Sequence, residues 1–196
     1  MIRGSGRFDV VPAALLLVLA LFTCWPQAAG AVHAQRRRMI PEKRLGAATA
    51  SYFPKGRHVT VQATPLRVAG DIENGVVLIP SFIVPGRKVV APKLVSLQLI
   101  VDSPAEAPTP PVKVQVFSEG HELVSGVAAL ISASALKNGS VTRVLMYKIP
   151  YGKFLRMLKG KEVRVRLGRI EFGIKEEQLS AMRDLQRMVA DGVSFP

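Results

Sequence analysis

The residues best able to do chemistry are the cations of a short segment, KEVRVRLGR, which begins at Lys161. Its valines and arginines alternate, which is the two-residue period of a strand with one buried face and one solvated face. Such a strand presents Arg164 and Arg166 on the solvated face, and cations gathered in this way attract the anionic groups of a polyanion. We therefore predict a candidate anion-binding surface, which we call the β-strand cation set: Lys159, Arg164, Arg166 and Arg169.

The same pattern also suits an ordinary strand whose polar face is only solvated, and the sequence favours this alternative. Strand platforms that bind nucleic acid interleave aromatic side chains with the cations so that bases can stack. The nearby Phe154 and Phe172 occupy positions where core side chains belong. A nucleic-acid platform is therefore disfavoured.

Catalytic and metal-binding patterns are scarce. The segment that begins at His121 resembles the zinc motif HExxH, but Ser125 stands where the second histidine is required. Neither a nucleophile elbow nor a phosphate-binding glycine loop occurs. We predict no enzymatic activity, no catalytic or metal-binding residue and no cofactor. A secreted hydrolase stays open as an alternative, with His58 or His121 beside Asp71 or Asp102, because triads are recognised by geometry.

The first 34 residues have the pattern of a secretory signal peptide. Arg3 and Arg7 form a basic start, residues 13–25 (AALLLVLALFTCW) are an apolar core, and Val32-His33-Ala34 fits a signal-peptidase site. The apolar core is shorter than the ~20 residues that span a bilayer. We predict an exported protein, either periplasmic or extracellular. Three arginines at positions 36–38 oppose translocation, so an uncleaved N-terminal membrane anchor is the alternative.

Removal of residues 1–34 leaves a strongly basic chain without cysteine. The full chain has 27 Lys and Arg against 14 Asp and Glu; losing Arg3, Arg7 and Asp9 leaves 25 − 13 = +12. The only cysteine, Cys24, is lost as well, which excludes disulfides and thiolate ligands. Stability must then come from an apolar core. A surface this positive attracts anions of any kind, so charge alone selects no ligand.

The rest of the chain is predicted to be one β domain over residues 57–196, preceded by a basic flexible linker over residues 35–56. Alternating or apolar strand patterns occur at 58–63, 75–84 (bent at Pro80), 94–101, 112–117, 127–136, 141–149 and 161–168. Turn signals lie at 118–121 and 137–140. The proline-rich residues 102–111 suit an exposed loop, and residues 170–174 are expected to continue the basic strand past Gly168.

Two helices are expected near the C-terminus. Residues 151–160 (YGKFLRMLKG) suit a short helix that ends at Gly160, and residues 176–192 are amphipathic, with Glu176 and Glu177 in the first turn. Many short strands and a helix only at the end predict a mainly β fold. We expect an antiparallel β-sandwich or open barrel with a short helix and a C-terminal amphipathic helix.

The last fifty residues carry one faint resemblance. Its motif elements are Ile149-Pro150-Tyr151, Phe154-Leu155, Val163, Leu167-Gly168, Glu171-Phe172 and Gln178-Leu179. In their order these elements are similar to uncharacterised exported bacterial β-sandwich proteins. They are mostly packing positions, so the resemblance implies a fold tendency and no activity. Lys153 and Lys175 depart from the acidic or capping residues expected at their positions.

These observations together predict a non-enzymatic exported protein that binds or supports a partner in the cell envelope, through a basic surface. The expected partner is an envelope polyanion or another protein, and membrane contact is expected only through an uncleaved signal. The alternatives are the hydrolase described above and a structural or assembly subunit, which would expose an apolar patch or form an oligomer.

Overall fold

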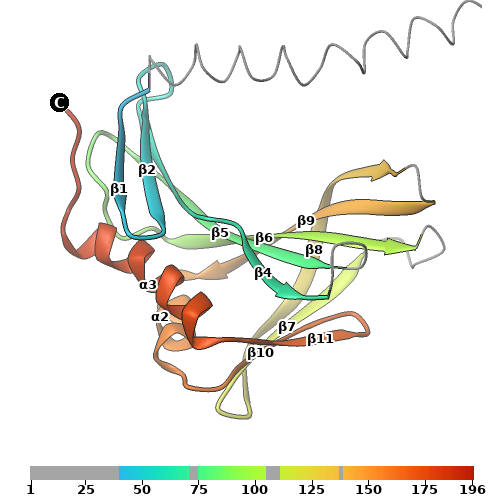
Figure 1. Cartoon of the computed structure of the whole chain (residues 1–196). Helices are drawn as coiled ribbons and strands as arrows, with labels where there is room; N and C mark the ends of the chain where they lie inside the picture. The colour runs from blue at the N-terminus through green and yellow to red at the C-terminus, as the bar shows by residue number, and fades with distance from the viewer. Residues whose placement is uncertain (1–39, 71–74, 105–110, 137–138) are drawn as a thin grey trace, which may run out of the picture. The chain divides into compact units, whose positions relative to one another are not determined.

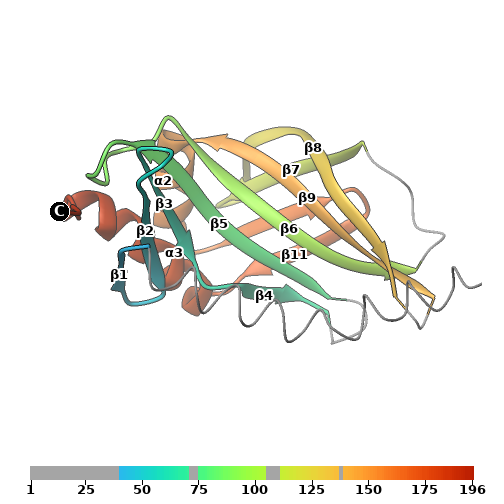
Figure 2. The same ribbon diagram turned by 90° about the horizontal axis from the view of Figure 1, so that it is seen from above.

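A computed structural model of the chain describes residues 40–70, 75–104, 111–136 and 139–196. The predicted signal peptide, Asp71, most of the proline-rich loop and two residues of the 137–140 turn lie outside these ranges. Residues 41–196 belong to one folding unit (Figures 1 and 2). Within the described ranges, no helix is long and apolar enough to cross a membrane.

The fold is mainly β and antiparallel, as predicted. The strands are β1 (Glu42–Leu45), β2 (Ala48–Phe53), β3 (His58–Ala63), β4 (Leu66–Ala69), β5 (Val76–Pro85), β6 (Leu94–Pro104), β7 (Val112–Ser118), β8 (His121–Ala135), β9 (Ser140–Pro150), β10 (Val163–Leu167) and β11 (Ile170–Ile174). The helices are α2 (Tyr151–Lys159) and α3 (Glu176–Ala190), which confirms the short helix and the C-terminal helix. The eleven strands form one open sheet in the order β1-β2-β3-β5-β6-β9-β8-β7-β10-β11, with β4 beside β5.

Strand β8 joins the two parts of this sheet. Its residues 121–128 pair with β7, whereas residues 129–135 pair with β9. Because β8 changes neighbours midway, β7, β10 and β11 diverge from β6 and β9 (Figure 1). Helix α2 packs against β6 to β9, and α3 packs against β1 to β3. The helices therefore lie on the inner side of a strongly bent sheet.

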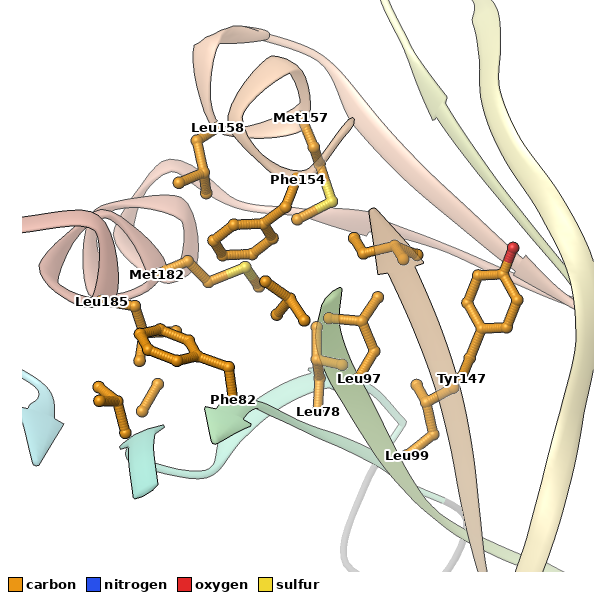
Figure 3. Close-up of a cluster of buried hydrophobic side chains, with 14 of the residues drawn as sticks. Leu78, Phe82, Leu97, Leu99, Tyr147, Phe154, Met157, Leu158, Met182 and Leu185 are labelled. Carbon is orange, nitrogen blue, oxygen red and sulfur yellow. The ribbon is translucent and has the colours of Figure 1, made fainter. Parts of the chain in front are cut away.

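Inward side chains of the sheet and the apolar faces of both helices form one core. Phe154 of α2 is completely buried. Figure 3 shows it close to Met182 of α3 and above the side chains of Leu78 and Leu97 from β5 and β6. The helices thus bring side chains from the end of the chain onto strands from its middle.

The sequence pattern around Pro80 fits either one bent strand or two short strands. In the structure Pro80 lies inside the single strand β5 without interrupting it. On one side it pairs with Leu97 of β6. On the other edge, the pairing of β4 ends at Leu78 and that of β3 begins at Ser81. A proline in a sheet needs an edge without a partner because it has no N–H, and the gap between β3 and β4 supplies one.

The sheet begins earlier than the sequence predicts. Residues 42–53, within the predicted linker over 35–56, form β1 and β2. Alternate residues of β2 are inward, and Ala48 and Ala50 are completely buried. Alanines give a weak apolar signal, yet their small size suits a strand that lies close beneath α3.

Two further boundaries differ from the prediction. Strand β6 continues to Pro104, into the predicted loop over 102–111, and the Thr142 hydroxyl of β9 donates to the Asp102 carboxylate at 2.6 Å. Residues 170–174 do not continue β10. Gly168 adopts φ +59°, a conformation that glycine takes readily, and the chain reverses so that β11 pairs antiparallel with β10.

Helix α3 is capped by a residue inside its own first turn. A lysine side chain cannot accept a hydrogen bond, so Lys175 is a poor cap, as the sequence indicates. Instead the Gln178 Oε1 accepts the Lys175 N–H at 2.7 Å, while its Nε2 donates to the carbonyl of Arg67 in β4. Farther along, Asp184 accepts the Ala47 N–H at 2.8 Å. These contacts join α3 to β4 and to the β1–β2 turn.

Candidate functional site

The structure confirms the alternation in the basic strand β10. Val163, Val165 and Leu167 are 2, 2 and 3% exposed, whereas Arg164 and Arg166 point outward. The outward side chains therefore stand on the solvated face of the sheet, as the spacing predicts.

These two arginines are paired with acids. The Glu171 carboxylate of β11 forms salt bridges with Arg164 Nη1 at 3.1 Å and with Arg166 Nη2 at 2.7 Å. The Glu162 carboxylate forms a third, with Arg164 Nε at 3.1 Å. The hydrogen bond from Arg166 is the main cause that lowers the pKa of Glu171, and the charges of both arginines add to it. Arg166 also lies over the Phe117 ring, 5.4 Å from its centre. Part of the predicted positive charge is thus neutralised within the sheet.

The β-strand cation set does not converge on one point. Lys159 ends α2, before β10, and Arg169 lies in the turn after β10. The strand between them has five residues and spans roughly 13 Å at ~3.3 Å per residue. Both side chains are exposed. The four residues therefore line one strand from end to end and form no pocket-like cluster.

The two histidines lie in different surroundings. His58, at the start of β3, stacks on Phe53 with ring centres 5.1 Å apart. His121 is exposed in the β7–β8 turn. Among the described residues neither forms a hydrogen bond with an acid or a hydroxyl, and Asp102 is bonded to Thr142 instead. The geometry therefore adds no support to the histidine-based alternative.

A denser group of cations lies at another place, which we call the basic end. It consists of three segments: the β2–β3 turn with its flanks (53–58), the end of β5 with the β5–β6 connection (83–94), and the junction of β9 and α2 (148–153). The three segments contain no acid. Their seven lysines and arginines are Lys55, Arg57, Arg87, Lys88, Lys93, Lys148 and Lys153.

Backbone contacts bring these segments together. His58 pairs with Pro85 across β3 and β5, and the Gly86 N–H donates to the Arg57 carbonyl at 2.8 Å. The Tyr151 N–H donates to the Lys93 carbonyl at 3.0 Å. In Figure 2 the β2–β3 turn, the β5–β6 connection and the end of β9 lie close together, and in Figure 1 the β5–β6 connection runs down the left side from near the β2–β3 turn to the start of β6.

The seven cations of the basic end have no acidic partner in the part of the chain that the structure describes. Arg87 lies over the Tyr52 ring, 5.6 Å from its centre. The acids of neighbouring segments are Glu42, within 3.5 Å of the Ser51 hydroxyl, and Asp191, just after α3. Positive charge therefore dominates here, in contrast to β10.

Exposed aliphatic side chains lie among these cations. Ile83, Leu94 and Val90 are 65, 48 and 44% exposed. Ser81 and Ser96 pair across β5 and β6, so Ile83 and Leu94, each two residues farther toward the loop, share the outward face. The basic end is therefore both cationic and apolar, a combination suited to a partner that is charged at its surface and apolar beneath it.

The sequence contains the residues of the basic end but no pattern that singles them out. The segments KGRH (55–58) and PGRK (85–88) each combine a turn glycine with basic residues. Each segment, taken by itself, has the sequence of an ordinary polar turn. Only the pairing of β3 with β5, which are not consecutive along the chain, places Arg57 beside Gly86.

A carboxylate in the β7–β8 turn binds the backbone just before the first residue of β10. Glu119 Oε1 accepts the backbone N–H groups of Lys161 at 2.6 Å and Glu162 at 3.1 Å. These bonds, first that of Glu162, lower the pKa of Glu119 below its ordinary value of 4.5. Since the folded-state pKa is depressed, the carboxylate stabilises the fold above the unfolded-state pKa. That contribution is lost as the pH falls through the folded-state pKa.

We expect Glu119→Gln to lower the unfolding free energy at neutral pH and to lower it much less in acid. The amide has no charge with which to hold the two N–H groups, whereas at low pH the wild-type carboxyl has lost its charge as well. Urea unfolding of both proteins in steps from about pH 7 down to about pH 2 measures how the difference changes with pH. Glu177→Gln, whose carboxylate makes no hydrogen bond within the described ranges, is the control. A pH-independent difference for Glu119→Gln would contradict the role of its charge.

Binding is the chemistry that this arrangement serves best. The described residues hold no group of three or more His, Cys, Asp and Glu side chains suited to a metal ion. The basic end offers exposed ammonium and guanidinium groups to an anion, and the aliphatic side chains beside them offer apolar contact. No family model, curated protein or solved structure matches the chain.

Proposed function

We propose that the protein is exported and acts without catalysis, by binding an anionic partner of the cell envelope through the basic end. The observation that carries this proposal is the set of seven cations that have no acidic partner among the described residues, on three adjoining segments without an acid. Cations with no internal partner keep their full attraction for an external anion.

The β-strand cation set is the weaker choice for this role. Arg164 and Arg166 already share Glu171, and an external anion would have to compete with that carboxylate. Lys159 and Arg169 stand at opposite ends of β10. The basic end needs no such competition, which is why we place the contact there.

Retention on immobilised heparin, a soluble polyanion, tests the proposal. Removing two contact cations with Lys55→Ala/Arg57→Ala should lower the salt concentration of elution and reduce the dependence of log affinity on log salt by roughly two. Arg164→Ala/Arg166→Ala removes the same formal charge from β10 and should change both quantities less. Equal effects of the two double variants would show that retention follows net charge alone, and the basic end would then have no special role.

An assembly subunit is the second candidate, and it is favoured by β8. Residues 123–136 carry no charge and no proline. Val127 and Ile131 are 61 and 55% exposed, and residues 129–135 pair with β9 on one edge and with no other described strand. Edge strands usually carry lysine or proline, which prevents pairing with other chains; here only a bulge at Ile131 serves that purpose.

Sedimentation velocity tests this second candidate over a range of protein concentrations. If β8 joins copies of the chain, the wild type should associate and Ile131→Lys should be monomeric, because a charge on an edge strand opposes pairing. A wild-type chain that stays monomeric at all concentrations would rule out self-assembly through β8.

A further inference from the structure

The exposed apolar side chains of the basic end narrow the class of partner. A purely anionic polymer is bound by cations alone and gains little from aliphatic contact. Ile83, Leu94 and Val90 are nevertheless exposed between the cations rather than withdrawn into the core. A lipid bilayer offers both partners at once, since anionic headgroups cover an apolar interior.

The aromatic side chains of this end argue against nucleic acid. Tyr52 and Phe195 stack on each other and are only 6 and 7% exposed. Phe53 is occupied by the His58 ring. Base stacking needs open aromatic faces. Tyr151, the other aromatic residue of the basic end, is only partly exposed and stacks on the buried Phe154, so the most exposed apolar side chains here are aliphatic. Aliphatic groups beside cations are typical of an interfacial membrane contact.

The chain enters the sheet at this same end. The Tyr52 N–H donates to the Pro41 carbonyl at 3.0 Å, so the start of β1 lies at the end of β2 that leads into the β2–β3 turn. Pro41 and the start of β1 therefore lie beside the basic end.

From these observations we infer that the basic end docks on the surface of an anionic lipid membrane, with its cations on the headgroups and Ile83 and Leu94 at the apolar boundary. The inference rests on the proposed function and names its partner. It differs from the expectation from sequence, in which only an uncleaved signal touches a membrane. Glu122, Glu162 and Glu171 on the face that carries β10 make that face the poorer match for anionic headgroups.

Vesicle co-sedimentation of the full chain tests the inference. Any contribution of the N-terminal segment is common to the wild type and the variants, so their differences report the basic end. With vesicles of phosphatidylcholine containing about one third phosphatidylglycerol, Lys55→Ala/Arg57→Ala should bind about 30-fold more weakly than wild type. Ile83→Ser/Leu94→Ser, which keeps every charge, should bind about tenfold more weakly. Arg164→Ala/Arg166→Ala should bind within about twofold of wild type.

The outcomes separate this inference from the proposed function because the same variants are run on heparin. Weaker vesicle binding of both basic-end variants, with Ile83→Ser/Leu94→Ser unchanged on heparin, supports the inference.

If Lys55→Ala/Arg57→Ala weakens heparin binding but neither variant weakens vesicle binding, the lipid inference is overturned and the proposed function stands. If Ile83→Ser/Leu94→Ser leaves vesicle binding unchanged, the partner is a polyanion and not a bilayer. If no basic-end variant matters on either probe, both proposals fail. Equal thermal midpoints of all variants confirm that each is folded.

Discussion

Phe154→Ala should lower the free energy of unfolding by about 3–5 kcal/mol, the largest effect that we expect from one side chain. Phe154 is completely buried and belongs to a helix of nine residues. A helix this short is not stable alone, so its packing side chains must hold it in place. Removing the ring leaves a cavity beneath α2 and loosens α3 as well, because Arg183 Nε donates to the Leu158 carbonyl at 3.1 Å.

Urea unfolding followed by circular dichroism measures this loss as a shift of the midpoint at constant slope. A loss of 3–5 kcal/mol is a large part of the roughly 5–15 kcal/mol that stabilises a typical domain. Ile83→Ala is the control, because this side chain is 65% exposed and its truncation should cost less than about 1 kcal/mol. Similar midpoints for Phe154→Ala and Ile83→Ala would contradict the core that we describe.

Gly46→Ala should lower the free energy of unfolding by about 3 kcal/mol, although only one methyl group is added. Gly46 lies in the β1–β2 turn with φ +56°, and a Cβ there would stand 2.1 Å from the Asp184 Oδ2. That oxygen cannot move freely. Asp184 is buried, accepts the Ala47 N–H at 2.8 Å and is paired with Arg187 Nη1 at 2.8 Å. The new methyl group would therefore force α3 away from the turn.

Gly86→Ala is the control that separates the two possible causes of destabilisation: the steric clash of a new Cβ, and the strain of a positive φ. Gly86 has φ +85°, and no atom lies within 4 Å of an added Cβ. Backbone strain alone would make Gly86→Ala the costlier change, since φ +56° is within the left-handed region open to other residues. The structure predicts the opposite order.

A double-mutant cycle assigns the cost to the contact between Gly46 and Asp184. In an Asp184→Ala background, Gly46→Ala should cost only about 1 kcal/mol, because the blocking carboxylate is gone. Additive effects of Gly46→Ala and Asp184→Ala would show that the two residues do not interact.

The parts of the fold that the sequence predicts are those with a clear period. The alternation at residues 58–63 and 112–117 and the amphipathic pattern at 176–190 correspond to β3, β7 and α3. Residues 42–53 have the sequence pattern of a linker, because Ala48 and Ala50 are too small to give an apolar period. The continuity of the sheet through β8 depends on a change of neighbours halfway along one strand. A sequence pattern gives the faces of a strand but not its neighbours.

The candidate site shows the same limit. The spacing of Arg164 and Arg166 predicts that they point outward, and they do. The sequence does not predict that Glu171 neutralises them, because its pattern indicates that residues 170–174 extend the basic strand. In the structure these residues turn back and pair with it. The basic end is assembled from turns, whose polar residues look alike in sequence whether or not the fold brings them together.

The packing of α3 on β1 to β3 has a consequence for the order in which the chain can fold. Synthesis delivers β1 to β3 first, but α3, which packs on them, begins only at Glu176. The longest ladder, between β6 and β9, likewise joins Leu94 to Pro150. A chain without α3 would expose the inner face of β1 to β3 to water, so native structure can form only after α3 has been made. This late completion keeps the growing chain without its native core while residues 41–190 are being made.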